Sequence, residues 1–145
     1  MLLVTSVEPK EIKMKILILE DHAFFASEII EYFQEDTEIE AVYAKSYKEA
    51  IAAIEKHKKF DFSILDVILQ NGKTGIDVAR LHKEELGTIM FLTGCCDTTT
   101  LNALQEYIVV SKLEIIWPKL DQFIKGELKP LKDIGSSSQA AHKAI

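Results

Sequence analysis

The sequence is poor in cysteine, which limits the kinds of cross-link and metal site that it can form. Its 145 residues include only two cysteines, and these are adjacent, Cys95 and Cys96. Neighbouring cysteines rarely close an unstrained disulfide, and they match no spaced set of metal ligands. We therefore expect neither a disulfide framework nor a cysteine metal site.

Long apolar runs and an excess of basic residues are also missing. The longest apolar runs hold only about five residues, whereas a membrane-spanning helix needs roughly 20 and a signal-peptide core roughly 7–15. The net charge of −6 disfavours a general nucleic-acid binder, because phosphate backbones attract a basic face. The sequence thus predicts a cytoplasmic protein with no direct contact to nucleic acid or membrane.

What the sequence does contain is a regular alternation of short apolar runs with stretches of helical spacing. Runs that are apolar throughout are typical of strands buried on both faces of a parallel sheet. Between the runs, apolar residues recur every three or four positions, as Phe25, Ile29 and Phe33 do. Ser46 and Glu49 form a capping-box pair, which indicates a helix start. The expected strands are residues 16–19, 39–43, 60–65, 89–92 and 113–117.

This alternation predicts a single three-layer α/β domain over residues 14–132. Strands that alternate with helices at this spacing form right-handed βαβ units, so five of each make a doubly wound (βα)5 domain with a five-stranded parallel sheet. Residues 1–13 are expected to be an N-terminal extension before a second methionine. Residues 133–145 are mostly small and polar and are expected to be a flexible tail.

Carboxylates and a hydroxyl stand where the expected strands end. Glu20 and Asp21 follow the first strand, Asp66 ends the third, and Thr93 ends the fourth. Since ligands of open parallel sheets bind outside the carboxyl ends of the strands, these side chains are expected to converge. Three carboxylates repel one another unless a cation is present, and their oxygens suit Mg²⁺. Together with a metal and a hydroxyl, one carboxylate could accept a phosphoryl group.

The segments around these residues resemble the signature segments of response-regulator receiver domains. They read KILILEDH, FSILDVIL, NGKTGIDVA and FLTG, and the resemblance covers about residues 14–130. It implies a flavodoxin-like fold with strand order 2-1-3-4-5. It also implies a signalling switch rather than an enzyme, phosphorylated by a sensor histidine kinase or phosphotransfer protein and acting on a downstream protein target. The alternative is a pseudo-receiver, an interaction module that keeps the fold and works without phosphorylation.

The resemblance also implies a role for each residue of the constellation. Asp66 matches the phosphoacceptor, and Thr93 matches the hydroxyl that contacts the phosphoryl oxygens. Glu20 and Asp21 match the acidic pair that holds Mg²⁺ directly or through water. The backbone carbonyl of Ile68 matches a further metal ligand, beside Asp66 itself.

The family's lysine at the end of the fifth strand has two candidate counterparts. If residues 107–111 are the strand, Lys112 is the lysine, and Pro118 falls inside the fifth helix, where proline removes a hydrogen bond. If residues 113–117 are the strand, Pro118 matches the proline that follows the family lysine, and it stands at a tolerated first-turn position. We adopt the second register, in which Trp117 takes the position of the family lysine. In this register either Lys119 reaches back to the site as a displaced cation or the site has no cation.

Three positions depart from the residue types that are usual in the family. The aromatic switch residue, three positions before the lysine, becomes Glu114 in the adopted register. The residues two after the phosphoacceptor and two after the threonine influence attacking water, and here they are Ile68 and Cys95. Because neither offers a carboxylate or an amide to orient water, we expect self-dephosphorylation to take many minutes or longer.

Overall fold

The computed structural model describes residues 14–69, 74–94, 97–114 and 116–134. Strands and α-helices alternate along these residues, beginning with a strand at Met14. The predicted extension, residues 1–13, lies outside the described residues, as do Cys95, Cys96 and all of the predicted tail beyond residue 134. No helix within the described ranges is long and apolar enough to cross a membrane.

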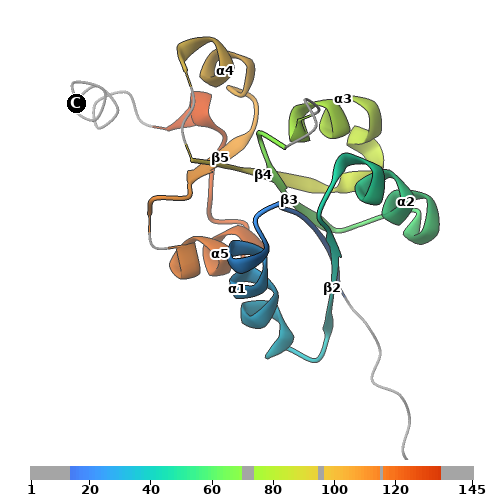
Figure 1. The fold of residues 1–145 in the computed structure, drawn as a ribbon. Helices are drawn as coiled ribbons and strands as arrows, with labels where there is room; N and C mark the ends of the chain where they lie inside the picture. The colour runs from blue at the N-terminus through green and yellow to red at the C-terminus, as the bar shows by residue number, and fades with distance from the viewer. Residues whose placement is uncertain (1–13, 70–73, 95–96, 115, 135–145) are drawn as a thin grey trace, which may run out of the picture.

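The strands form one parallel sheet in the order β2-β1-β3-β4-β5, which confirms the predicted fold (Figure 1). β1 and β3 are central, and their side chains are almost entirely buried, as the uninterrupted apolar runs predict. The strands are β1 (Met14–Leu19), β2 (Ile39–Ala44), β3 (Phe62–Asp66), β4 (Thr88–Thr93) and β5 (Ile108–Ser111).

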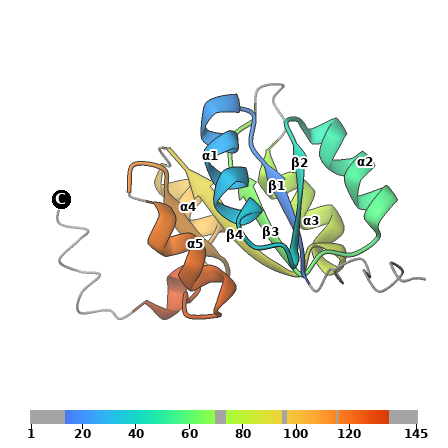
Figure 2. The ribbon, with the colours of Figure 1, turned by 90° about the horizontal axis from the view of Figure 1, so that it is seen from below.

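Helices cover both faces of the sheet, and alternate side chains of each strand enter different cores. In β1, Ile16 and Ile18 pack against α1 and α5, whereas Leu17 and Leu19 pack with α2 and α3 on the opposite face. Figure 2 shows the sheet between these two helical layers. The helices are α1 (Ala23–Gln34), α2 (Tyr47–His57), α3 (Gly75–Leu86), α4 (Thr98–Ala103) and α5 (Ile116–Ile124).

Side-chain caps determine where several helices begin. The Ser46 hydroxyl accepts a hydrogen bond from the Glu49 backbone N–H at 3.1 Å, as the capping pair predicts. At the start of α3, Thr74 and Asp77 form a full capping box, with side chains and backbone N–H groups bonded reciprocally. The Ser46 cap starts α2 three residues after β2 ends, so the loop between them at the carboxyl edge of the sheet is short.

The predicted fifth strand, residues 113–117, is wrong. β5 is Ile108–Ser111 and pairs with residues 90–93 of β4, and α5 already begins at Ile116. Pro118 is the third residue of α5. Because the first-turn amides of a helix have no intrahelical acceptor, a proline there removes no hydrogen bond. Pro118 is therefore compatible with a fifth strand at residues 108–111.

Beyond α5 the chain turns back across the edge of the sheet. Gly126 has a positive φ of 75°, a backbone conformation that glycine adopts without steric cost. The chain then reaches the short 3-10 helix η2 (Leu131–Asp133), where the Leu131 backbone N–H donates to the Tyr107 carbonyl at 2.9 Å. This segment is thus attached to the residues just before β5, and a cavity lies between it and the strand.

Candidate functional site

The three predicted carboxylates converge at the carboxyl edge of the sheet. One oxygen each from Glu20, Asp21 and Asp66 lies within 4.8 Å of the others. β1 and β3 are neighbours in register, with Leu19 opposite Leu65, so the next residue along each chain segment, Glu20 or Asp66, is brought beside the other. Glu20 is fully buried and Asp66 is only 4% exposed, while Asp21 is half-buried. Three negative charges thus meet where little water can screen them.

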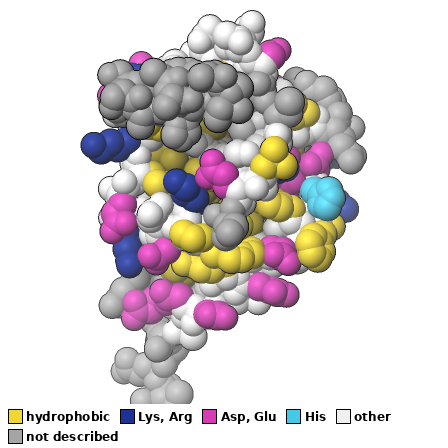
Figure 3. Space-filling model, turned by 90° about the vertical axis from the view of Figure 1, so that its left-hand side faces the viewer, with side chains coloured by type: hydrophobic (Ala, Val, Ile, Leu, Met, Phe, Trp, Pro, Cys, Tyr) yellow, Lys and Arg dark blue, Asp and Glu magenta, His cyan; other side chains and the backbone are white. Residues whose placement is uncertain are grey.

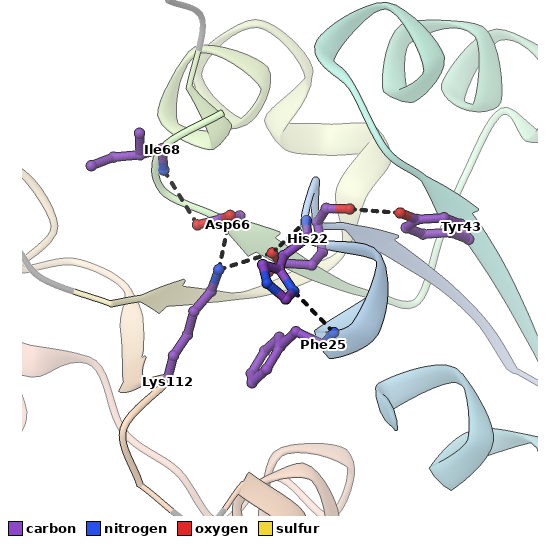
Figure 4. A network of polar contacts seen from close by, with 7 residues as sticks. His22, Phe25, Tyr43, Asp66, Ile68 and Lys112 are labelled. Carbon is purple, nitrogen blue, oxygen red and sulfur yellow. Dashed lines mark hydrogen bonds and ion pairs between the residues drawn. The ribbon is translucent and has the colours of Figure 1, made fainter. Parts of the chain in front are cut away.

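Lys112 supplies a cation to this cluster. Its Nζ donates to Asp66 Oδ2 at 3.0 Å, as Figure 4 shows, and to Glu20 Oε2 at 2.9 Å. The residue directly follows β5, and its backbone N–H donates to the Thr93 carbonyl at 2.8 Å. Its Nζ also lies 5.1 Å from the centre of the Phe25 ring, within range of a cation–π contact.

The prediction that Lys119 provides the cation is therefore wrong. Lys119 is the fourth residue of α5 and lines a cavity beside β5, whereas Lys112 bridges the carboxylates. The incorrect register follows from matching Pro118 to the proline that comes after the family lysine. Leu113 follows the bridging lysine instead of a proline. The distance along the sequence from Thr93 argued against Lys119, because the incorrect register needs an insertion of about two residues after Thr93 relative to the usual spacing in the family.

Glu20 is held in place by several contacts, but one of its carboxylate oxygens accepts no hydrogen bond from the described residues. The His22 backbone N–H donates to Glu20 Oε2 at 3.0 Å, and the Tyr43 hydroxyl donates to the Glu20 backbone carbonyl at 2.8 Å. Glu20 Oε1 is buried and has no hydrogen-bond partner among the described residues. A buried acceptor without a partner carries a desolvation penalty, which a bound cation or water would relieve. This oxygen and the all-oxygen donor set fit a hard divalent cation such as Mg²⁺.

Ile68 and Thr93 lie at the same edge as the carboxylates. The Ile68 backbone N–H donates to Asp66 Oδ1 at 3.4 Å, and the Ile68 side chain is 61% exposed. Thr93 ends β4 one residue after Leu92, the partner of Asp66, and is nearly buried. The structure thus brings together every predicted site residue except Lys119.

A glycine permits the close approach of α3 to the end of β3 at Asp66. A Cβ added to Gly75 would lie 2.1 Å from the backbone oxygen of Asp66, a distance that no side chain can occupy. The Gly75 N–H donates to the Val67 carbonyl at 3.1 Å, which anchors the start of α3 beside the site.

The crowding of charge shifts the protonation of the site. Burial and the neighbouring Glu20 carboxylate raise the pKa of Asp66 to about 7, although the hydrogen bond from Lys112 opposes this change. Burial also lowers the pKa of Lys112, but its hydrogen bonds to Glu20 and Asp66 outweigh burial and leave that pKa raised. Without a metal ion, the site therefore takes up a proton near neutral pH while Lys112 stays charged.

No family model matches the sequence, and no curated protein matches it. Solved structures do match. A two-component response regulator from Clostridium difficile is 22% identical, with a TM-score of 0.65 over 79% of this chain and 95% of that chain. The response regulator domain of Thermotoga maritima CheB is 19% identical, with the same score and coverages. The signal receiver domain of a DNA binding response regulator protein from Colwellia psychrerythraea is 17% identical, with a TM-score of 0.63 over 78% of this chain and 99% of that chain.

The chain has the fold of response-regulator receiver domains. At these identities the likeness establishes the fold alone, and the chemistry rests on the side chains of the site.

Within the receiver fold, the register of β5 also moves the aromatic switch position. Three residues before Lys112 stands Val109, rather than the Glu114 of the incorrect register. The nearest aromatic residue before it is Tyr107, whose ring packs edge-on against Phe91 with centroids 5.0 Å apart. A rotating aromatic side chain at the usual position is therefore absent. The position two after the threonine, Cys95, lies outside the described residues.

Removing the Lys112 ammonium should destabilise the metal-free protein. Lys112→Ala leaves Glu20 and Asp66 facing each other without a cation, and loss of one partner from a buried charge cluster is costly. Because Lys112 is partly exposed, we expect a loss of roughly 2 kcal/mol in the free energy of unfolding, measured with urea in EDTA at pH 8. The control, Lys119→Ala, should change it by less than about 0.5 kcal/mol. Equal losses from the two variants would contradict the assignment.

The raised pKa of Asp66 predicts an unusual pH dependence of stability. Its folded-state pKa of about 7 lies above the ordinary value of 3.8, so the folded state binds more protons between these values. The contribution of Asp66 to the free energy of unfolding should therefore fall as pH rises from about 4 to about 7, by at most about 1.4 kcal/mol per pH unit. Asp66→Asn, compared with the wild type in EDTA, should lack this component. Parallel pH profiles for the two proteins would rule out the shift.

Proposed function

We propose that this chain is a response-regulator receiver that accepts a phosphoryl group on Asp66. The observation that carries the proposal is the pairing of this nearly buried carboxylate with Lys112, beside Glu20 and Asp21. A carboxylate in this setting is a nucleophile with cationic groups placed to stabilise a transferring phosphoryl group. The receiver fold places these groups at the edge where ligands of open parallel sheets bind.

The proposed donor is a phosphohistidine of a sensor histidine kinase or phosphotransfer protein. An Asp66 oxygen forms a bond to phosphorus, the phosphorus–nitrogen bond of the donor breaks, and the imidazole nitrogen keeps the electron pair. Lys112 donates hydrogen bonds to oxygens of the transferred group, and the Thr93 hydroxyl contacts them as the group arrives. Mg²⁺, held by the three carboxylates and the Ile68 carbonyl, would supply neutralisation of the charge on those oxygens.

Phosphorylation would redistribute the contacts of Lys112. In the unphosphorylated protein its Nζ binds Glu20 and Asp66. A phosphoryl group on Asp66 adds negative charge and acceptor oxygens, so it competes for this ammonium. Because the Lys112 backbone is bonded to Thr93, a change at the site reaches the ends of β4 and β5 together. The proposed output is a changed protein-binding surface around α4, β5 and α5.

The main support for the alternative, a phosphorylation-independent pseudo-receiver, is the uncertain identity of the family lysine in the sequence. The contacts of Lys112 with Glu20 and Asp66 favour the receiver over this alternative, because they supply a cation beside the proposed acceptor. The replacement of the aromatic switch residue by Val109 remains as a departure, but it concerns how the change is transmitted and not whether Asp66 is modified.

The acceptor can be identified by intact mass. After incubation with Mg²⁺ and acetyl phosphate, the wild type should gain a single phosphoryl group, because Asp66 is the one of the two carboxylates bridged by Lys112 that is not fully buried. Asp66→Asn and EDTA-treated wild type should gain none, while the control Asp133→Asn, at an exposed carboxylate in η2, should behave as the wild type. Folded wild-type protein that gains no adduct from acetyl phosphate or from a histidine kinase would refute the proposal.

The lifetime of the phosphoryl group should be long. The Ile68 side chain cannot orient water for attack on phosphorus, since it has no polar atom. After removal of the donor, we expect the adduct to persist for many minutes in a time course of intact mass. Ile68→Asn, which introduces an amide at an exposed position, should shorten this time. Complete loss from the wild type within seconds, without a phosphatase, would contradict the prediction.

A further inference from the structure

Far from Asp66, α1 and α5 enclose a groove with an aromatic floor. The rings of Tyr32 and Trp117 stack, with centroids 6.0 Å apart and an interplanar angle of 7°. A cavity of about 390 Å³ is lined by this pair, and a second of about 490 Å³ extends from Tyr32 toward Ile39 at the start of β2. Tyr32 and Glu35 line both cavities, so the two cavities are neighbours. We call the two cavities together the acidic groove.

Carboxylates form the rim of the acidic groove. Glu28, Glu31 and Glu35 follow one another at spacings of three and four along α1, so they share a helical face. Among the described residues, none of these three glutamates forms an ion pair, and the ion pair recorded at the groove joins Lys125 to Asp121 at 3.0 Å. Figure 3 shows hydrophobic side chains bordered by acidic ones over the lower part of the face where α5 and α1 lie.

These glutamates work against the stability of the helix that carries them. Like charges three or four residues apart repel. Negative charge near the C-terminal end of a helix also opposes the helix dipole. α1 has no basic residue in its last turn, and its C-cap residue is Glu35. α2 has the favourable arrangement, with Lys56 and His57 in its last turn. A cationic partner would relieve both costs in α1.

We propose that the acidic groove binds a basic segment of a partner protein, with arginine or lysine side chains placed between the α1 glutamates and the Tyr32–Trp117 stack. A guanidinium group stacks on aromatic rings and bonds to carboxylates at the same time. Residues 28–35 span about 10 Å along α1, which is long enough for about three residues of an extended chain. A segment of protein therefore fits the groove better than a single small cation. The proposal does not depend on phosphorylation of Asp66.

Trp117 gives a local readout, because it is the only tryptophan in the sequence. The probe is a short capped peptide of alternating arginine and alanine, titrated into the full-length protein while Trp117 emission is recorded. We expect a saturable change in emission. The same peptide with glutamine in place of arginine should produce none, and an equal response to both peptides would overturn the charge-based proposal.

A matched pair of variants separates the groove from the overall acidity of the protein. Glu31→Gln with Glu35→Gln should weaken peptide binding by at least about tenfold. Glu55→Gln with Glu84→Gln removes the same charge from exposed positions on α2 and α3 and should change affinity less than about twofold. The first double variant should melt at the same or a higher temperature, which excludes unfolding as the cause. Equal weakening by the two double variants, or none by either, would overturn the proposal.

Two other possible occupants of the acidic groove, a second copy of the chain and the chain's own ends, would give different results. If the wild type sediments as a dimer and the Glu31→Gln, Glu35→Gln variant as a monomer without peptide, the groove binds a second copy of the chain. If exchanging Lys10, Lys13 and Lys143 for glutamine shifts Trp117 emission without peptide, it binds the chain's own ends. Either result would overturn the assignment to a partner protein.

Discussion

The contact on which the rest of the site depends is the bridge from Lys112 to two buried carboxylates. Glu20 and Asp66 are brought together by the pairing of β1 with β3, and their repulsion is not screened by water. An ammonium 2.9–3.0 Å from both offsets that repulsion without filling the remaining coordination space. The site is thus stable enough to form in the folded chain. It still contains a Glu20 oxygen with no hydrogen-bond partner in the described part of the chain, and a carboxylate, Asp66, with a raised pKa.

The same bridge joins strands that are distant in the sequence. Glu20 follows β1, Asp66 ends β3, and Lys112 follows β5 while its backbone binds the end of β4. Any change in charge at Asp66 therefore acts on four neighbouring strand ends at once. The acidic groove lies toward the opposite edge of the sheet, since α1 runs antiparallel to the strands and its last turns are farthest from Asp66.

The sequence predicted the fold and the acidic cluster because both depend on local patterns. Short apolar runs such as those of β1 and β3 are best explained as buried strands. Carboxylates directly after these runs then meet at the carboxyl edge of the sheet. The fifth strand depends on a choice between two similar apolar segments. Ile116 is one residue of the segment assigned to a strand, but it also lies at helical spacing with Leu120 and Phe123, and in the structure all three are buried in α5.

Tertiary pairing decides between those segments, because only one of them can lie beside β4 with the helices in place. β5 has just four residues, and the preceding α4 has six with none buried, so neither gives a strong periodic signal. The unpartnered Glu20 oxygen and the stacking of Tyr32 on Trp117 are likewise invisible in the sequence, since each joins residues of different elements.

A double-mutant cycle between Lys112 and Asp66 tests the central bridge most directly. The free energy of unfolding is measured in EDTA at pH 8 for the wild type, Lys112→Met, Asp66→Asn and the double variant. Without the lysine, the Glu20–Asp66 repulsion is unopposed, so Asp66→Asn should stabilise the Lys112→Met background more than the wild type, by about 1–3 kcal/mol. Equal effects of Asp66→Asn in the two backgrounds, within about 0.3 kcal/mol, would show that Lys112 does not bridge these carboxylates.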